Sequence, residues 1–187
     1  AAITLGGIQS ISRVSAAIVP FMAVAYLVIC TGLISLHFAD IPAAISLILD
    51  SAFTGTAAVG GFAGSTIMIA MQNGIARGVF SNESGLGSAP IAAAAAKTKW
   101  PAEQGLISMT GTFIDTIIIC SLTGLTLVLT GVWSGDTSGA AMTSAAFAGS
   151  FGDIGSQLLT LALVLFAFTT ILGWNYYGER ACLYLFG

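Results

Sequence analysis

The stretch between Arg13 and Asp40 contains no charged side chain, and residues 18–36 within it are mostly apolar. At 1.5 Å of rise per residue, a helix over this stretch is long enough to cross the ~30 Å hydrocarbon core of a bilayer. Only 7% of the residues in the whole chain are charged and 56% are hydrophobic, whereas soluble domains carry roughly 25% charged residues. The sequence therefore predicts an all-α, polytopic transmembrane protein rather than a soluble domain.

We expect one partial transmembrane domain over residues 1–187, with four crossings separated by short polar loops. The expected crossings are residues 16–37, 57–96, 104–130 and 156–178, of which the second is interrupted near 81–85. Residues 41–53 are too short to span and are predicted to be an interfacial helix or a re-entrant segment. Residues 131–155 are a connector rich in Gly, Ser, Thr and Ala, in which residues 140–151 are predicted to be a short helix in the membrane surface.

The few charged residues outside the crossings fall on two sides. Arg13, Lys97, Lys99 and Arg180 lie on one side of a four-crossing topology. The opposite loops contain Asp40, Asp50, Asp136 and Asp153 and no lysine or arginine. Because cytoplasmic loops are enriched in Lys and Arg, the basic side is predicted to be cytoplasmic.

Other functional classes find little support. The chain has no basic cluster of the kind that binds nucleic acid. The cysteines (Cys30, Cys120, Cys182) have no metal-binding spacing. The single histidine, His37, lies at a membrane edge, so a nucleophile with a base is not evident and an intramembrane enzyme is disfavoured. Nothing resembles a repeated selectivity filter, which disfavours a channel.

The second crossing contains the glycines Gly78, Gly85 and Gly87 around the polar sequence Ser-Asn-Glu-Ser of residues 81–84. This composition is poor for continuing a helix. A broken helix would offer carbonyl groups that suit an ammonium group or Na⁺, and N–H groups that suit a carboxylate. Alternatively, the crossing ends at Ala76 and the polar residues form a cytoplasmic loop, and charge bias alone does not decide between the two.

Three charged residues, Arg77, Glu83 and Asp115, fall inside the membrane in this topology. Charges at bilayer depth are costly and are candidates for functional roles. They are expected to face protein or a water-filled cavity, and we hypothesise that Glu83 forms a buried ion-pair latch with Arg77 or Asp115.

In the fourth crossing, Thr169 and Thr170 lie side by side, and Trp174 follows Thr170 on the same helical face. Adjacent hydroxyl groups provide oxygen ligands of the kind that hard cations such as Na⁺ prefer. Alternatively, both hydroxyls donate to carbonyl groups of their own helix, as is common in membranes.

Residues 74–90, GIARGVFSNESGLGSAP, closely resemble the signature of the alanine/glycine:cation symporter family. Residues 60–64, 113–116 and 168–174 also look like that family. The resemblance runs from about residue 13 to residue 187. It implies a fragment of a LeuT-type inverted-repeat fold, covering about the fifth to eighth core helices and lacking the first to fourth.

The resemblance implies sodium-coupled symport of a small neutral amino acid, alanine or glycine, by alternating access in a bacterial or archaeal cell membrane. Some members use H⁺, so a proton-coupled transporter is the alternative. No cofactor is implied other than the coupling ion Na⁺. The implied substrate contacts are Phe80, Ser81, Asn82, Thr170 and Trp174, and the implied Na⁺ ligands are Thr169 and Thr170.

Overall fold

The computed structural model describes residues 3, 6–53, 63–83 and 85–187. The described residues form helices and no strands, which confirms the predicted all-α class. The elements, in chain order, are α2 (Gly7–Leu36), η1 (Phe38–Asp40), α3 (Ile41–Phe53), α4 (Ala63–Asn82), α5 (Ala89–Ala93), α6 (Pro101–Thr112), η3 (Phe113–Cys120), α7 (Ser121–Leu129), η4 (Val132–Ser134) and α8 (Gly139–Phe186).

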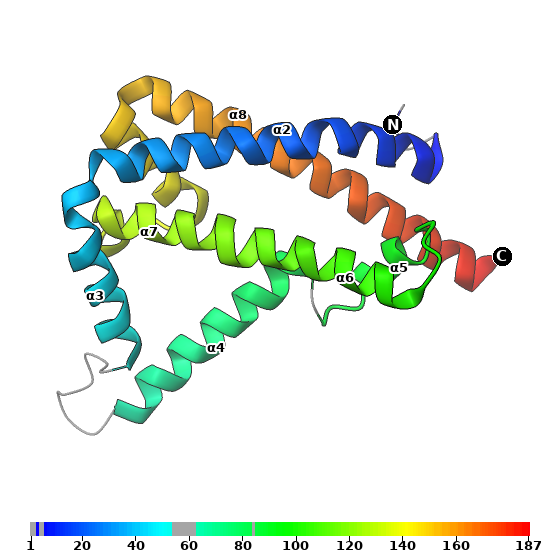
Figure 1. Cartoon of the computed structure of the whole chain (residues 1–187), viewed down its shortest axis with the longest axis horizontal. Helices are drawn as coiled ribbons and strands as arrows, with labels where there is room; N and C mark the ends of the chain where they lie inside the picture. Colours follow the sequence, from blue (N-terminus) through cyan, green and yellow to red (C-terminus); the bar gives the residue numbers. More distant parts are fainter. Residues whose placement is uncertain (1–2, 4–5, 54–62, 84) are drawn as a thin grey trace.

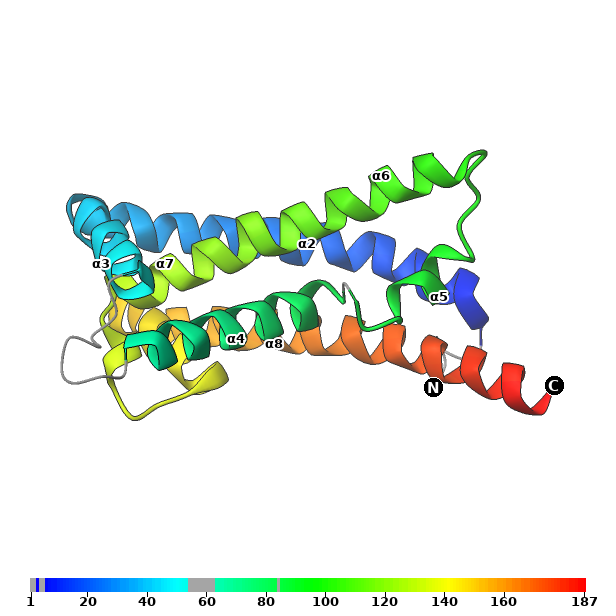
Figure 2. The same ribbon diagram turned by 90° about the horizontal axis from the view of Figure 1, so that it is seen from below.

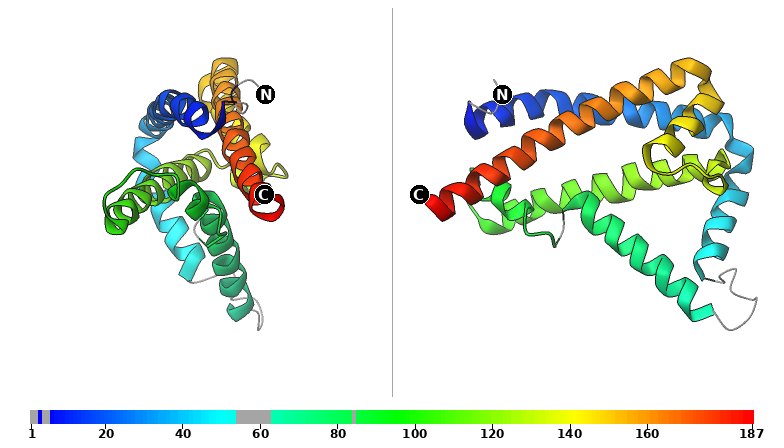
Figure 3. Two further views of the ribbon diagram at one scale, coloured as in Figure 1. Left: turned by 90° about the vertical axis from the view of Figure 1, so that its right-hand side faces the viewer. Right: turned by 180° about the vertical axis from the view of Figure 1, so that it is seen from behind.

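Three of these helical runs are long and apolar enough to cross a membrane: α2, the run Pro101–Leu129 that joins α6, η3 and α7, and α8. They lie alongside one another, while α3 crosses one end of the bundle (Figures 1 and 3). The second predicted crossing is divided between α4 and α5, and its residues 57–62 lie outside the described residues.

The core lies between α2 and α8. Cys30 and Leu33 of α2 and Phe147 of α8 are fully buried. The Tyr26 ring packs edge-on against Phe166, with ring centroids 5.8 Å apart. Most other large apolar side chains are exposed, which fits helices that face lipid or further protein.

Helix α8 contains a kink at Gly152, whose backbone angles are φ 65° and ψ −152°. This backbone region is essentially restricted to glycine. The kink divides α8 into a short arm and a long arm, where the sequence predicted a surface helix over 140–151 and a crossing over 156–178. The two predicted helices are thus joined at one glycine, with no loop between them.

The basic residues that were expected on one side gather at one end of the bundle. Arg13 and Lys97 line the same hollow, and Arg180 lines an adjoining hollow that shares Ile8 and Ala95 with it. The start of α2 and the end of α8 also lie at this end (Figure 1). The basic residues that the charge pattern assigns to one side of the membrane thus lie near one another, and their assignment to the cytoplasmic side stays a prediction.

Candidate functional site

Helix α4 ends at Asn82 and α5 begins at Ala89. Between them, Glu83, Gly85 and Gly87 have φ angles of 57°, 91° and 82°. These are left-handed conformations, which glycine adopts without steric cost and which stop an α-helix. The described residues of the polar segment therefore separate two helices, as the broken-crossing interpretation requires, while Ser84 lies outside the described residues.

The position of the break differs from the prediction. It was expected near 81–85, with Gly78 as part of it, but Gly78, Ser81 and Asn82 all belong to α4. At the end of the helix, the side chains of Ser81 and Asn82 bond to a neighbouring helix, and these bonds offset the tendency of Ser and Asn to interrupt a helix. Gly78 is tolerated inside α4 at a cost of about 1 kcal/mol relative to alanine.

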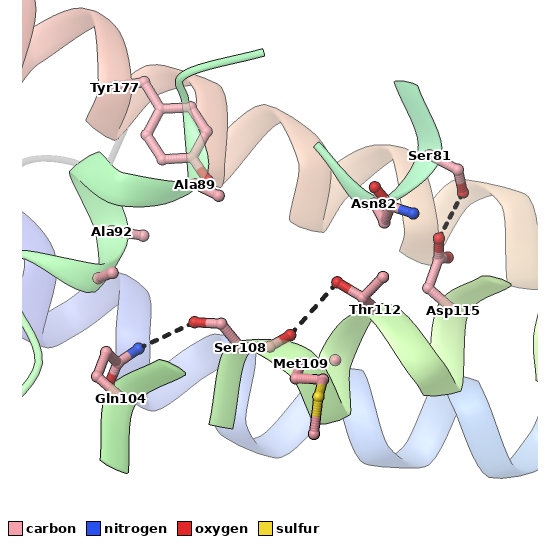
Figure 4. Close-up of a pocket in the computed structure, with 12 residues that line it drawn as sticks. Ser81, Asn82, Ala89, Ala92, Gln104, Ser108, Met109, Thr112, Asp115 and Tyr177 are labelled. Carbon is pink, nitrogen blue, oxygen red and sulfur yellow. Dashed lines mark hydrogen bonds between the residues drawn. The ribbon is translucent and has the colours of Figure 1, made fainter. Parts of the chain in front are cut away.

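The last two residues of α4 are tied to η3. The Ser81 hydroxyl donates to Asp115 Oδ2 at 2.6 Å (Figure 4), and Asn82 Nδ2 donates to Thr116 Oγ1 at 2.9 Å. Asp115 lies midway along the run Pro101–Leu129, where the backbone forms a π-helix. Such π-helical segments often occur at functional sites, and here the segment directs a carboxylate toward the end of the broken helix.

Glu83 links the break to two other helices. Its Oε2 accepts a hydrogen bond of 2.7 Å from the hydroxyl of Ser88, the residue before α5. Its carboxylate also interacts with the hydroxyl group of Tyr177 on α8. Within the described ranges, neither Glu83 nor Asp115 forms an ion pair with Arg77 or any other cationic side chain. The partners of the two carboxylates are hydroxyl groups instead, that of Ser88 for Glu83 and that of Ser81 for Asp115. Asp115 is itself a carboxylate and cannot form an ion pair with Glu83.

Beside the break is a hollow of about 570 Å³, which we call the α4–α6 hollow (Figure 4). Its wall contains Ser81 and Asn82 from α4, Ala89, Ala92 and Ala93 from α5, Gln104, Ser108, Met109, Gly111 and Thr112 from α6, Asp115 from η3 and Tyr177 from α8. The volume falls within the usual range of ~300–1,000 Å³ for small-molecule sites. The hollow thus combines a carboxylate, several hydroxyl and amide groups, and small side chains that leave room for a ligand.

The threonine pair lies outside this hollow. Thr169 Oγ1 donates to the carbonyl oxygens of Phe166 (3.0 Å) and Leu165 (3.2 Å), and Thr170 Oγ1 donates to that of Phe166 at 2.9 Å. These are the hydrogen bonds to carbonyl groups of the same helix that the sequence offered as the alternative to Na⁺ binding. They use the hydroxyl hydrogens and leave oxygen lone pairs for a cation, so the predicted Na⁺ role stays a prediction.

The predicted substrate contacts are brought together only in part. Ser81 and Asn82 line the α4–α6 hollow, whereas Phe80, Thr170 and Trp174 are exposed and do not line it. Trp174 is connected to the hollow indirectly, because its ring packs against Tyr177 with centroids 5.8 Å apart.

The sequence reasoning missed the polar wall on α6. Its members Gln104, Ser108 and Thr112 recur every four residues along α6. That spacing places them on one helical face and is a signal that the sequence contained.

Comparison with known proteins places the chain in one family. The family model for the sodium:alanine symporter family matches residues 1–187. The chain is 57% identical to an uncharacterized transporter of Haemophilus influenzae, with 99% of the chain and 41% of the relative covered. It is 47% identical to the sodium/alanine symporter AgcS of Methanococcus maripaludis, with 100% and 41% covered. It is 36% identical to the probable sodium/glutamine symporter GlnT of Bacillus subtilis, with 95% and 36% covered. The chain thus spans about two fifths of the length of these relatives.

Proposed function

On the premise that this chain belongs to the sodium:alanine symporter family, we propose that the complete protein imports alanine or glycine together with Na⁺ by alternating access. Membership makes the protein a multi-pass transporter of the plasma membrane rather than an enzyme. The observation that supports the proposal most directly is the end of the broken helix α4, which is hydrogen-bonded to a mid-membrane carboxylate and faces a hollow.

The broken helix supplies groups for both ends of an amino acid. The carbonyl groups at the C-terminal end of α4 suit an ammonium group, since this end of a helix carries partial negative charge. Ser81 and Asn82 lie at that end and line the hollow. In this proposal Phe80 and Trp174 limit the size of the substrate side chain, which favours alanine and glycine over larger amino acids. The remaining contacts would come from helices that precede this segment.

The Na⁺ ligands in this proposal include the hydroxyl oxygens of Thr169 and Thr170. Both hydroxyl hydrogens are already donated to carbonyl groups of α8, so both oxygens are oriented with lone pairs available. Thr169 also lies 4.0 Å from the Met22 sulfur of α2, so Thr169 is on the side of α8 that faces α2, while Thr170 is exposed. The other oxygen ligands would come from the missing helices.

We expect uptake of labelled alanine by the complete transporter to require Na⁺. We expect Thr170→Val to raise the Na⁺ concentration that gives half-maximal uptake about tenfold, since contacts to a charged group contribute about 1.5–3 kcal/mol. The measurement is the initial rate of uptake against Na⁺ concentration in proteoliposomes. Thr160→Val is the matched control, because Thr160 is also an exposed threonine of α8 whose hydroxyl donates to a carbonyl of the preceding turn. An unchanged Na⁺ half-saturation in Thr170→Val would place the ion elsewhere, and uptake that is unaffected by replacing Na⁺ with choline would contradict the function.

A further inference from the structure

Four polar side chains form a continuous wall along α6 and η3. Gln104, Ser108, Thr112 and Asp115 follow one another at spacings that keep them on one helical face, and all four line the α4–α6 hollow (Figure 4). Elsewhere on the same run, Leu106, Ile107 and Phe113 are more than half exposed and apolar. The run is thus amphipathic although it is long and apolar enough to cross a membrane.

Across the hollow, α5 offers these polar groups no side-chain partner, because its lining residues Ala89, Ala92 and Ala93 have no hydrogen-bonding groups in their side chains. The other polar groups that line the hollow are those of Ser81 and Asn82 of α4 and Tyr177 of α8. Apart from Asp115, which accepts from Ser81 of α4, the hydrogen bonds of this wall among the described residues run along α6 and are long: Gln104 Nε2 to Ser108 Oγ and Thr112 Oγ1 to the Ser108 carbonyl oxygen are both 3.4 Å.

Asp115 has unused capacity at the inner end of this wall. Its Oδ2 accepts the hydrogen bond from Ser81, while its Oδ1 accepts none from any residue that the structure describes. Leaving such a group dry at membrane depth costs several kcal/mol. Water in the hollow would supply the missing partners, since the space exceeds by far the volume of a single water molecule.

We propose that this wall borders a hydrated path that runs from the Lys97–Lys99 end of α6 to Asp115, and that a small monovalent cation binds at the inner end of the path. The ligand chemistry is a compact positive charge held by the Asp115 carboxylate, the Ser81 oxygen and the negative end of the α4 dipole. Na⁺ and the ammonium group of the substrate both have this chemistry. The physiological role of the path, as a route by which substrate and ion leave for the cytoplasm, rests on the proposed function.

Cysteine labelling of the complete transporter tests the path without requiring transport, so its outcome is independent of the proposed function. Thr112→Cys is compared with Thr110→Cys. Both threonines are on α6 and donate to the carbonyl four residues earlier, but only Thr112 lines the hollow. A cationic, membrane-impermeant thiol reagent applied from the cytoplasmic side is expected to label position 112 at least about tenfold faster than position 110. Equal rates, or labelling of position 112 only from the outside, would overturn the path.

The role of Asp115 is tested by adding Asp115→Asn to the Thr112→Cys variant. Loss of the carboxylate should slow the cationic reagent about tenfold relative to a neutral reagent of similar size, whereas a purely structural role would change both rates equally. Ligands are then added during labelling of the Thr112→Cys variant by the cationic reagent. If Na⁺ without alanine slows the labelling, the inorganic ion is the ligand. Protection only by alanine would identify the ammonium group, and protection by neither would overturn the cation site.

Discussion

Gly155→Ala is expected to destabilise the protein strongly, because it adds a methyl group where the two arms of α8 meet. A Cβ at this position would overlap the carbonyl oxygen of Phe147 and would lie 2.8 Å from the Phe151 Cβ. Phe147 is fully buried in the core between α2 and α8, so it has no room to retreat. Overpacking of this kind costs about 1–3 kcal/mol and sometimes more.

The measurement is the fraction of purified protein that stays monodisperse after heating. Gly149→Ala is the control, since Gly149 is also a glycine of α8 close to the kink, in the arm on the other side of Gly152, and an added Cβ there meets nothing within 4 Å. The control should be neutral or slightly stabilising, because alanine is the better helix former. Equal heat stability of the two variants would contradict the close packing at the kink.

The second large effect is expected at Glu83. Glu83→Ala removes the carboxylate that accepts from Ser88 and interacts with Tyr177, so the break loses its attachment to α5 and α8. Hydrogen bonds to charged groups contribute about 1.5–3 kcal/mol each. We therefore expect amino-acid uptake by the complete transporter to fall at least about tenfold at equal membrane expression, measured as initial rate per transporter.

The control separates the carboxylate from the backbone. Glu83 has a φ of 57°, a conformation that glycine adopts more easily than any other residue. Glu83→Gly therefore relieves the backbone while it also removes the carboxylate, and it should lose uptake as Glu83→Ala does. Normal uptake by Glu83→Gly would show that only the backbone conformation matters and would contradict the role of the attachment.

The break shows how far local sequence reasoning reaches. Gly85 and Gly87, on which the predicted interruption was based, both adopt positive φ angles that favour glycine. The sequence placed the start of the break near Ser81, whereas α4 continues to Asn82. The hydrogen bonds of Ser81 and Asn82 to η3 join residues more than 30 positions apart in sequence. Only the packed structure reveals such partners.

The π-helix and the kink illustrate two further limits. The sequence predicted a crossing over 104–130 but gave no local signal for the π-helical stretch Phe113–Cys120 that orients Asp115. For α8, the sequence predicted a short surface helix over 140–151 and a separate crossing over 156–178, yet one helix runs through both and changes direction at Gly152 alone. The backbone angles of a single glycine depend on how the arms pack, as at Gly155, and composition does not report that packing.

The measurement that tests sodium-coupled amino-acid import most directly is alanine accumulation by the complete transporter in proteoliposomes with imposed ion gradients. An inward Na⁺ gradient without a pH difference should drive labelled alanine to a higher concentration inside than outside. An inward H⁺ gradient without Na⁺ should not drive accumulation. Accumulation driven by H⁺ alone, or alanine that only equilibrates under the Na⁺ gradient, would contradict the proposed coupling.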